Sequence, residues 1–182
     1  VPSGRVRARV RFDEGEIADV TFVNVPSWVQ ATDLPVVTSR GPVTVDVAFG
    51  GAMYAVLPAA AVGLDVVPED YNALIAVGRE IRDKLNASGV IVHPDDERLS
   101  DVYGTIFTAP GSSGDPHHHR NVTVFADGEV DRSPCGSGTA ARLAHLVHRG
   151  EFARGDELRH ESIIGTTFKG RVVGEITVHG RR

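Results

Sequence analysis

The hydrophobic period of the chain switches between two residues and 3.6 residues, and this switch limits the fold most strongly. Strand-like alternation dominates the first half, whereas helical spacing begins at Pro68 and again near Gly136. A chain that carries both periods in separate segments is neither all-helical nor all-strand. Its 182 residues, 41% of them hydrophobic, are enough for one well-packed core of mixed structure.

The N-terminal part predicts a β-hairpin. Apolar Val6, Ala8 and Val10 alternate with arginines over residues 4–12, which predicts a half-buried strand with a basic outer face. Residues 17–23 supply a second strand after a turn at 13–15.

Further strands are expected at residues 43–49, 53–57, 90–93 and 103–109. The first two are separated by Gly50-Gly51, where we expect a close backbone approach or a positive φ angle. Pro68 begins an amphipathic helix with apolar residues at helical spacing, and the helix is expected to end near Gly89. Residues 110–116 have the composition of a loop.

Composition and charge exclude several classes of protein. No window is long and apolar enough to span a bilayer, and the start at Val1 has neither a signal core nor an initiator Met. A net charge of -5 with interspersed signs gives no basic face for nucleic acid. The single Cys excludes an internal disulfide and a Cys-rich zinc site, and it fits a reducing, cytoplasmic compartment.

That single residue, Cys135, lies where a helix is predicted to start. A strand at 121–125 and a turn at Asp127-Gly128 precede it, and apolar residues at helical spacing follow it up to Gly150. The first N–H groups of a helix lack partners and carry a partial positive charge. This position is therefore expected to lower the cost of a Cys135 thiolate.

The neighbours of Cys135 suit the recognition of an amino acid. Gly136 and Ser137 can offer backbone N–H groups to a carboxylate beside the sulfur. Asp131 can pair with the ammonium group of the same molecule. A thiolate next to this zwitterion can remove the proton from its α-carbon, and stabilisation of the carbanion without a cofactor predicts a site closed to water.

The segment Asp131-Arg132-Ser133-Pro134-Cys135-Gly136-Ser137-Gly138-Thr139 resembles the motif around the second catalytic Cys of the proline racemase family. Supporting segments, which together span most of the chain, lie at residues 24–27, 49–55, 120–128 and 161–172. The resemblance implies an α+β fold like that of diaminopimelate epimerase, in which each of two lobes wraps a curved mixed β-sheet around a central helix, here with an added peripheral helix. Residues 1–182 resemble a single lobe, the second one.

The family resemblance also implies roles for individual residues. Cys135 is one of two Cys residues that face opposite sides of the α-carbon, one taking a proton while the other donates one. Asp131 holds the substrate amine, Gly136 and Ser137 bind the carboxylate, and Phe125 packs against the ring. The implied activity is racemisation or epimerisation of proline or 4-hydroxyproline without a cofactor or metal, with the missing first lobe as the protein partner. Whether the chain forms a homodimer stays open.

Two departures from the family pattern matter. Ser137 replaces the usual Thr, which keeps a hydroxyl and an N–H group. The Cys-Gly-His motif of the first lobe is absent, so this chain alone is expected to be inactive. Two alternatives follow: a trans-3-hydroxy-L-proline dehydratase, which typically has Thr where Cys135 stands, and a noncatalytic domain that binds small zwitterions.

Several residues also have simpler interpretations. Cys135 alone would be read as a small buried hydrophobe, Asp131 as a turn or cap residue, and Phe125 as core. His117-His118-His119 is expected to be a solvated loop rather than a metal site, and His145 and His148 are expected to be structural.

Overall fold

A computed structural model describes residues 2–177, so Val1 and residues 178–182 lie outside the described part. The strands are β1 (Arg7–Asp13), β2 (Glu16–Val23), β3 (Trp28–Thr38), β4 (Gly41–Phe49), β5 (Met53–Pro58), β6 (Val102–Pro110), β7 (His118–Phe125), β8 (Glu129–Val130), β9 (Glu157–Ser162) and β10 (Thr167–Arg171). The α-helices are α1 (Tyr71–Ser88) and α2 (Gly136–His148), with short 3-10 turns at Ala59–Val62, Pro68–Asp70 and Glu97–Leu99.

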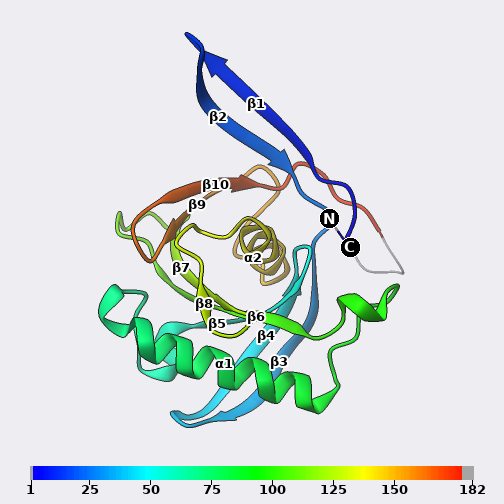
Figure 1. Cartoon of the computed structure of the whole chain (residues 1–182), viewed down its shortest axis with the longest axis vertical. Helices are drawn as coiled ribbons and strands as arrows, with labels where there is room; N and C mark the ends of the chain where they lie inside the picture. Colours follow the sequence, from blue (N-terminus) through cyan, green and yellow to red (C-terminus); the bar gives the residue numbers. More distant parts are fainter. Residues whose placement is uncertain (1, 178–182) are drawn as a thin grey trace.

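Strands β3 to β10 form one eight-stranded mixed sheet in the order β10-β9-β7-β6-β5-β4-β3, with β8 paired to β7. The β5–β6 and β7–β9 pairs are parallel, and the other neighbours are antiparallel. The sheet curves around α2, which is seen end-on in Figure 1, while α1 packs outside the curve. The expected α+β architecture, a curved mixed sheet with a central and a peripheral helix, is confirmed.

Helix α1 forms as the sequence predicts. Its entry is the 3-10 turn Pro68–Asp70, and it ends at Gly89, whose φ of 65° is left-handed. Its buried residues face the main apolar core, and they are Leu74, Val77, Gly78, Ile81 and Leu85. A smaller apolar cluster on the α2 side of the sheet contains Tyr54, Ile106 and Cys135.

The Gly50-Gly51 turn joins β4 to β5 and brings the sheet against α2. A Cβ atom added to Gly50 would lie 2.1 Å from the backbone oxygen of Ser137, and Gly51 has a φ of 111°. Only glycine permits this approach without displacing the first turn of α2. The close approach expected from the sequence is confirmed.

Two local predictions are wrong. Residues 90–93 alternate in exposure but form no strand, because alternation alone does not supply a backbone partner. His117-His118-His119 is not a solvated loop: β7 begins at His118, which is 1% exposed and lies between β6 and β9. The long strand β3 had not been predicted.

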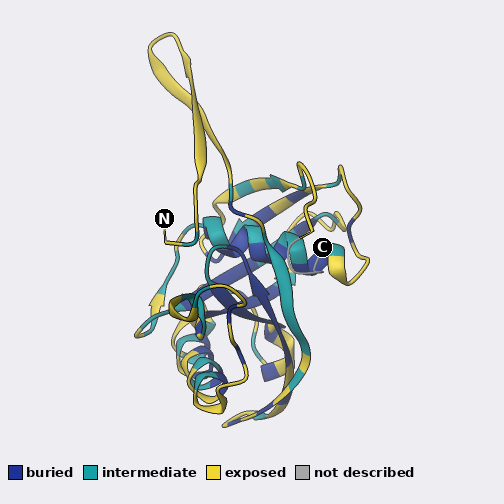
Figure 2. Cartoon of the chain, turned by 90° about the vertical axis from the view of Figure 1, so that its right-hand side faces the viewer, coloured by how far each residue is buried: buried dark blue, intermediate teal, exposed yellow. Residues whose placement is uncertain are grey.

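The N-terminal hairpin forms with the predicted turn, but its expected half-burial is wrong. Every residue of β1 and β2 is exposed, and Figure 2 shows the hairpin projecting from the rest of the described chain with no buried face. The alternation of apolar and charged residues is present, but among residues 2–177 the apolar side is left exposed, apart from its base, where the Phe22 ring lies beside Gly136. Within these residues, neither helix is long and apolar enough to cross a membrane.

Candidate active site

Cys135 lies at the N-cap of α2, as the sequence predicts. Its Sγ accepts a hydrogen bond from the Gly138 N–H at 3.3 Å, and its carbonyl oxygen accepts one from the Thr139 N–H at 2.8 Å. The backbone of Cys135 has φ 67° and ψ 120°. A residue with a Cβ in this region costs about 1–3 kcal/mol, so the surroundings must hold it there.

The loop before α2 supplies that restraint through successive hydrogen bonds. Asp131 Oδ1 accepts from the Ser133 N–H at 2.8 Å and from the Ser133 hydroxyl at 2.7 Å. Ser133 Oγ in turn accepts from the Cys135 N–H at 3.1 Å, and Asn121 Nδ2 donates to the Pro134 carbonyl at 3.1 Å. Asp131 is thus a turn residue, and contact of its carboxylate with a substrate amine stays a prediction.

Tyr54, a residue without a predicted role, lies beside the sulfur. Its hydroxyl oxygen is 2.7 Å from Ser137 Oγ, and these two oxygens lie 4.0 Å and 3.9 Å from Cys135 Sγ. The family-like segment at residues 49–55 contained this Tyr, but no signal in the sequence placed it beside Cys135. Burial, followed by the nearby thiol, raises the pKa of Tyr54, so its hydroxyl stays protonated.

The pKa of Cys135 departs from the sequence expectation. Burial raises it above 9.0, and the Asp131 carboxylate adds to the rise, while hydrogen bonds from Gly138, Ser137 and Tyr54 oppose it. The helix start does favour the thiolate, but removal of the charged sulfur from water outweighs it. Cys135, only 6% exposed, is therefore a protonated thiol in this structure.

Gly136 and Ser137 occupy the first turn of α2, where N–H groups have no acceptor within the helix. The amides of Gly138 and Thr139 are already directed to Cys135. A Cβ atom added to Gly136 would lie 3.1 Å from Cζ of Phe22, so the base of the hairpin covers this glycine. The structure brings Cys135, Gly136 and Ser137 together, and their binding of a carboxylate remains a prediction.

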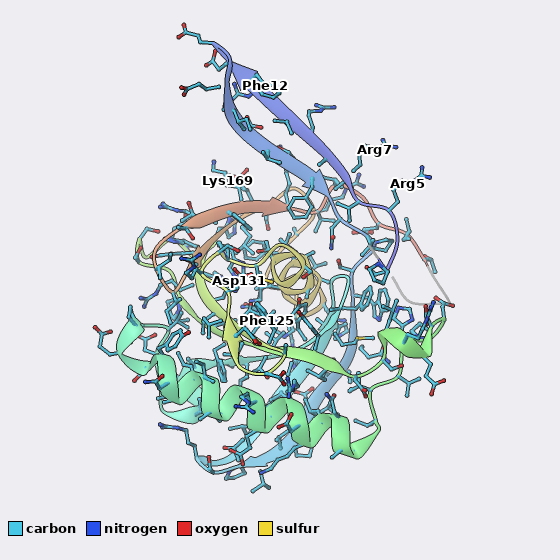
Figure 3. All side chains as sticks on the ribbon, in the orientation of Figure 1. Arg5, Arg7, Phe12, Phe125, Asp131 and Lys169 are labelled. Atoms are coloured by element: carbon cyan, nitrogen blue, oxygen red, sulfur yellow. The ribbon has the colours of Figure 1, made fainter. Side chains whose placement is uncertain are left out.

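Phe125 ends β7 and belongs to a row of aromatic rings. It stacks on Tyr103 with ring centres 5.7 Å apart, and Tyr103 meets Tyr54 edge-on at 6.1 Å. Figure 3 shows Phe125 and Asp131 on the side of the molecule where the segment entering α2 lies. An open cavity of about 360 Å³ borders Tyr103 and Gly51, but Cys135 is not among its lining residues.

The C-terminal half of α2 carries a polar cluster without a metal-binding arrangement. His145 Nε2 lies 2.6 Å from Asp46 Oδ2, and Arg149 contacts both oxygens of Asp46. Among residues 2–177, no three His, Cys, Asp or Glu side chains are grouped to hold a metal ion. His145 is buried beside Asp46, whereas His148 is exposed.

Several known proteins that match this chain are named as enzymes that act on hydroxyproline. The chain is 45% identical over 179 residues to a trans-3-hydroxy-L-proline dehydratase from Burkholderia cenocepacia, and 44% identical over 181 residues to a 3-hydroxyproline 2-epimerase from Burkholderia multivorans. A solved hydroxyproline epimerase from Agrobacterium vitis, with bound trans-4-hydroxy-L-proline, superimposes with a TM-score of 0.90 at 35% identity.

These matches cover 97% or 98% of this chain but only 53% of each Burkholderia protein and 52% of the Agrobacterium vitis chain. The chain thus spans about half the length of the relatives it matches. The family model described as proline racemase matches residues 1–182. On this match and these identities, the chain belongs to the proline racemase family.

Proposed function

We propose that this chain is the second lobe of a racemase or epimerase that acts at the α-carbon of proline or hydroxyproline without a cofactor. The observation that carries the proposal is Cys135, held in a left-handed backbone conformation at the start of α2 with its Sγ on the Gly138 amide. Strained residues persist where the surroundings over-determine them, which is common at active sites. The relatives include epimerases of hydroxyproline.

Because burial raises its pKa, Cys135 rests as a protonated thiol, so in the proposed reaction it acts first as the proton donor. In the proposed reaction, a base on the first lobe removes the α-proton, and the Cys135 thiol gives its proton to the opposite face of the carbanion. One C–H bond breaks and one forms, so the configuration inverts without a net change in protons. In the reverse direction the Cys135 thiolate is the base, and the Gly138 amide stabilises it.

Recognition of the substrate would use the same end of α2. The amides of Gly136 and Ser137 would receive the carboxylate, because they are the N–H groups of the first turn without a helical acceptor. Asp131 would receive the amine, and Phe125 would pack against the ring. Tyr54 would keep Ser137 in place through its hydroxyl, which lies 2.7 Å from Ser137 Oγ.

The second candidate is dehydration of trans-3-hydroxy-L-proline, since one relative named for that activity is 45% identical. The epimerase from Burkholderia multivorans is 44% identical, so overall identity does not separate the two reactions. Family dehydratases typically have Thr at the position of Cys135. A thiol there favours proton donation to carbon, and so favours epimerisation.

The test uses a joined protein in which this chain replaces the matching half of the Agrobacterium vitis epimerase. We expect it to epimerise hydroxyproline at C2, measured by chiral chromatography and by uptake of deuterium from D2O. Cys135→Ser should lower kcat by at least about 100-fold, since a positioned acid or base contributes that much. An unchanged unfolding midpoint serves as the folding control. Retained epimerisation in Cys135→Ser, or loss of water from trans-3-hydroxy-L-proline without epimerisation, would overturn the proposal.

A further inference from the structure

The β1–β2 hairpin has one wholly apolar face. Paired residues of antiparallel strands share a face, and successive residues alternate between faces. The register places three apolar pairs on one side: Ala8 with Phe22, Val10 with Val20, and Phe12 with Ile17. The other side carries Arg7 with Val23, Arg9 with Thr21, and Arg11 with Asp19. The irregularity between Arg11 and Phe12 keeps Phe12 opposite Ile17, so the apolar face continues to the tip.

Apart from its base at Phe22, this apolar face is exposed in the described chain. Phe12 is 63% exposed, Ile17 is 62% and Val20 is 57%. Figures 1 and 2 show the hairpin extending away from the sheet and both helices. A lone two-stranded hairpin is at best marginally stable in water, and contiguous exposed apolar surface marks an interaction site.

We infer that this face is the docking surface for the other half of a family-length protein, an inference that rests on the proposed function. The match to the solved Agrobacterium vitis epimerase covers 98% of this chain but only 52% of that protein. That protein therefore contains another half of similar size. In that epimerase the half that this chain does not match is part of the same polypeptide. A tethered surface is present at a far higher effective concentration than a second copy of this chain.

The position of Phe22 connects docking to the candidate site. Phe22 lies at the base of the apolar face, and its ring covers Gly136, where an added Cβ would be 3.1 Å from Cζ. A lobe that packs along Val10, Val20 and Phe22 therefore reaches the start of α2, next to Cys135. Docking of the other half would therefore also exclude water from the start of α2.

Thiol labelling on the two faces of β1 tests the inference. Val10→Cys lies on the apolar face, and its neighbour Arg9→Cys lies on the basic face as the matched control. In the chain alone, both thiols should react with iodoacetamide at rates within about twofold, because both positions are exposed. In the joined protein, Val10→Cys should react at least about tenfold more slowly while Arg9→Cys is unchanged. Peptide mass spectrometry measures each site separately from Cys135.

Equal labelling of the two positions in the joined protein would overturn the inference. So would protection of Val10→Cys in the chain alone that grows with concentration, together with a dimer mass, because the occupant would then be a second copy. Labelling does not depend on turnover. A joined protein that protects Val10→Cys but fails to epimerise contradicts the proposed function alone, and an active one without protection contradicts the docking alone.

A second measurement does not need the joined protein to fold. The unmatched half of the Agrobacterium vitis epimerase, carrying an affinity tag, is co-expressed with this chain, and the amount of chain that co-purifies is measured. Val10→Asp should lower the recovery at least about tenfold, since a buried charge opposes docking, whereas Arg9→Asp should not. Equal recovery of both variants, or no recovery of the native chain, would overturn the inference.

Discussion

The β1–β2 and β4–β5 pairs are both antiparallel and rich in β-branched residues, yet they differ completely in burial. Val47 and Ala55 on one face of β4–β5, and Ala48 and Val56 on the other, are at most 3% exposed. The first face joins the core under α1 and the second joins the cluster beside α2. The β1–β2 pair has neither cover. Its first strand alternates apolar residues with arginines, whereas β5 is a continuous apolar run, and one pair is core on both faces while the other is an open surface.

The comparison shows that a hydrophobic alternation specifies a strand and its faces but not what covers them. In the eight-stranded sheet, helices distant in the sequence supply the cover. At the hairpin, the proposed cover belongs to polypeptide outside the described residues. Matched substitutions in the two regions sharpen this contrast.

Removal of a buried side chain should give the largest difference. Leu57 in β5 is 2% exposed, so Leu57→Ala should destabilise the chain by about 2–5 kcal/mol through lost burial and a cavity. Ile17→Ala, at the exposed tip of the hairpin, should change stability by less than about 0.5 kcal/mol. Urea unfolding followed by circular dichroism measures both. A comparable loss in Ile17→Ala would mean that the hairpin already packs on something in the isolated chain.

Loss of an ion pair should give the next largest difference in stability between the two regions. Asp46, 6% exposed, contacts His145 and Arg149, so Asp46→Asn should cost about 1–3 kcal/mol by leaving buried polar groups without their charged partner. Asp19 pairs with Arg11 at the surface, and Asp19→Asn should cost less than about 1 kcal/mol. The same unfolding measurement applies. Equal costs would show that the Asp46 cluster does not depend on its burial.

Titration of a buried histidine should have the smallest effect on stability, and it concerns the eight-stranded sheet, since β1 and β2 contain no histidine. Burial, then the nearby Arg142, lowers the pKa of His160 from 6.5 to about 3, and Thr139 Oγ1 lies 2.9 Å from its Nδ1. A lowered folded-state pKa gives stability that is complete above the unfolded pKa of 6.5 and is lost as the pH falls below it. Between pH 7.5 and 6, the titration of His160 should lower the free energy of unfolding by less than about 1 kcal/mol.

The variant His160→Gln isolates this contribution. We expect its free energy of unfolding to fall less between pH 7.5 and 6 than that of the native chain, whatever its absolute stability. His148→Gln, at an exposed position of α2, is the control and should keep the native pH dependence. An unaltered pH dependence in His160→Gln would contradict burial of a neutral imidazole at this position.

Much of the candidate site could be predicted because its signals are local. The flanking glycines and the helical spacing after Cys135 placed it at the start of α2, and Gly50-Gly51 predicted a close approach that turned out to be against Ser137. Tyr54 could not be given a role, since its distance to the sulfur depends on how β5 packs on α2. The effect of the helix start on the Cys135 thiolate could be predicted, but the larger opposing effect of burial on its pKa could not, because burial depends on the whole fold.

The sequence by itself determined the period of each strand and helix, the glycine turns and the position of Cys135 at a helix start. These features depend on residues within a few positions of one another, whose backbone hydrogen bonds and side-chain directions are set locally. Tertiary structure alone decided which apolar faces are covered, that His118 is buried, and that the Cys135 thiol stays protonated. Burial and desolvation arise from surfaces brought together across the chain, and local sequence does not encode which surfaces meet.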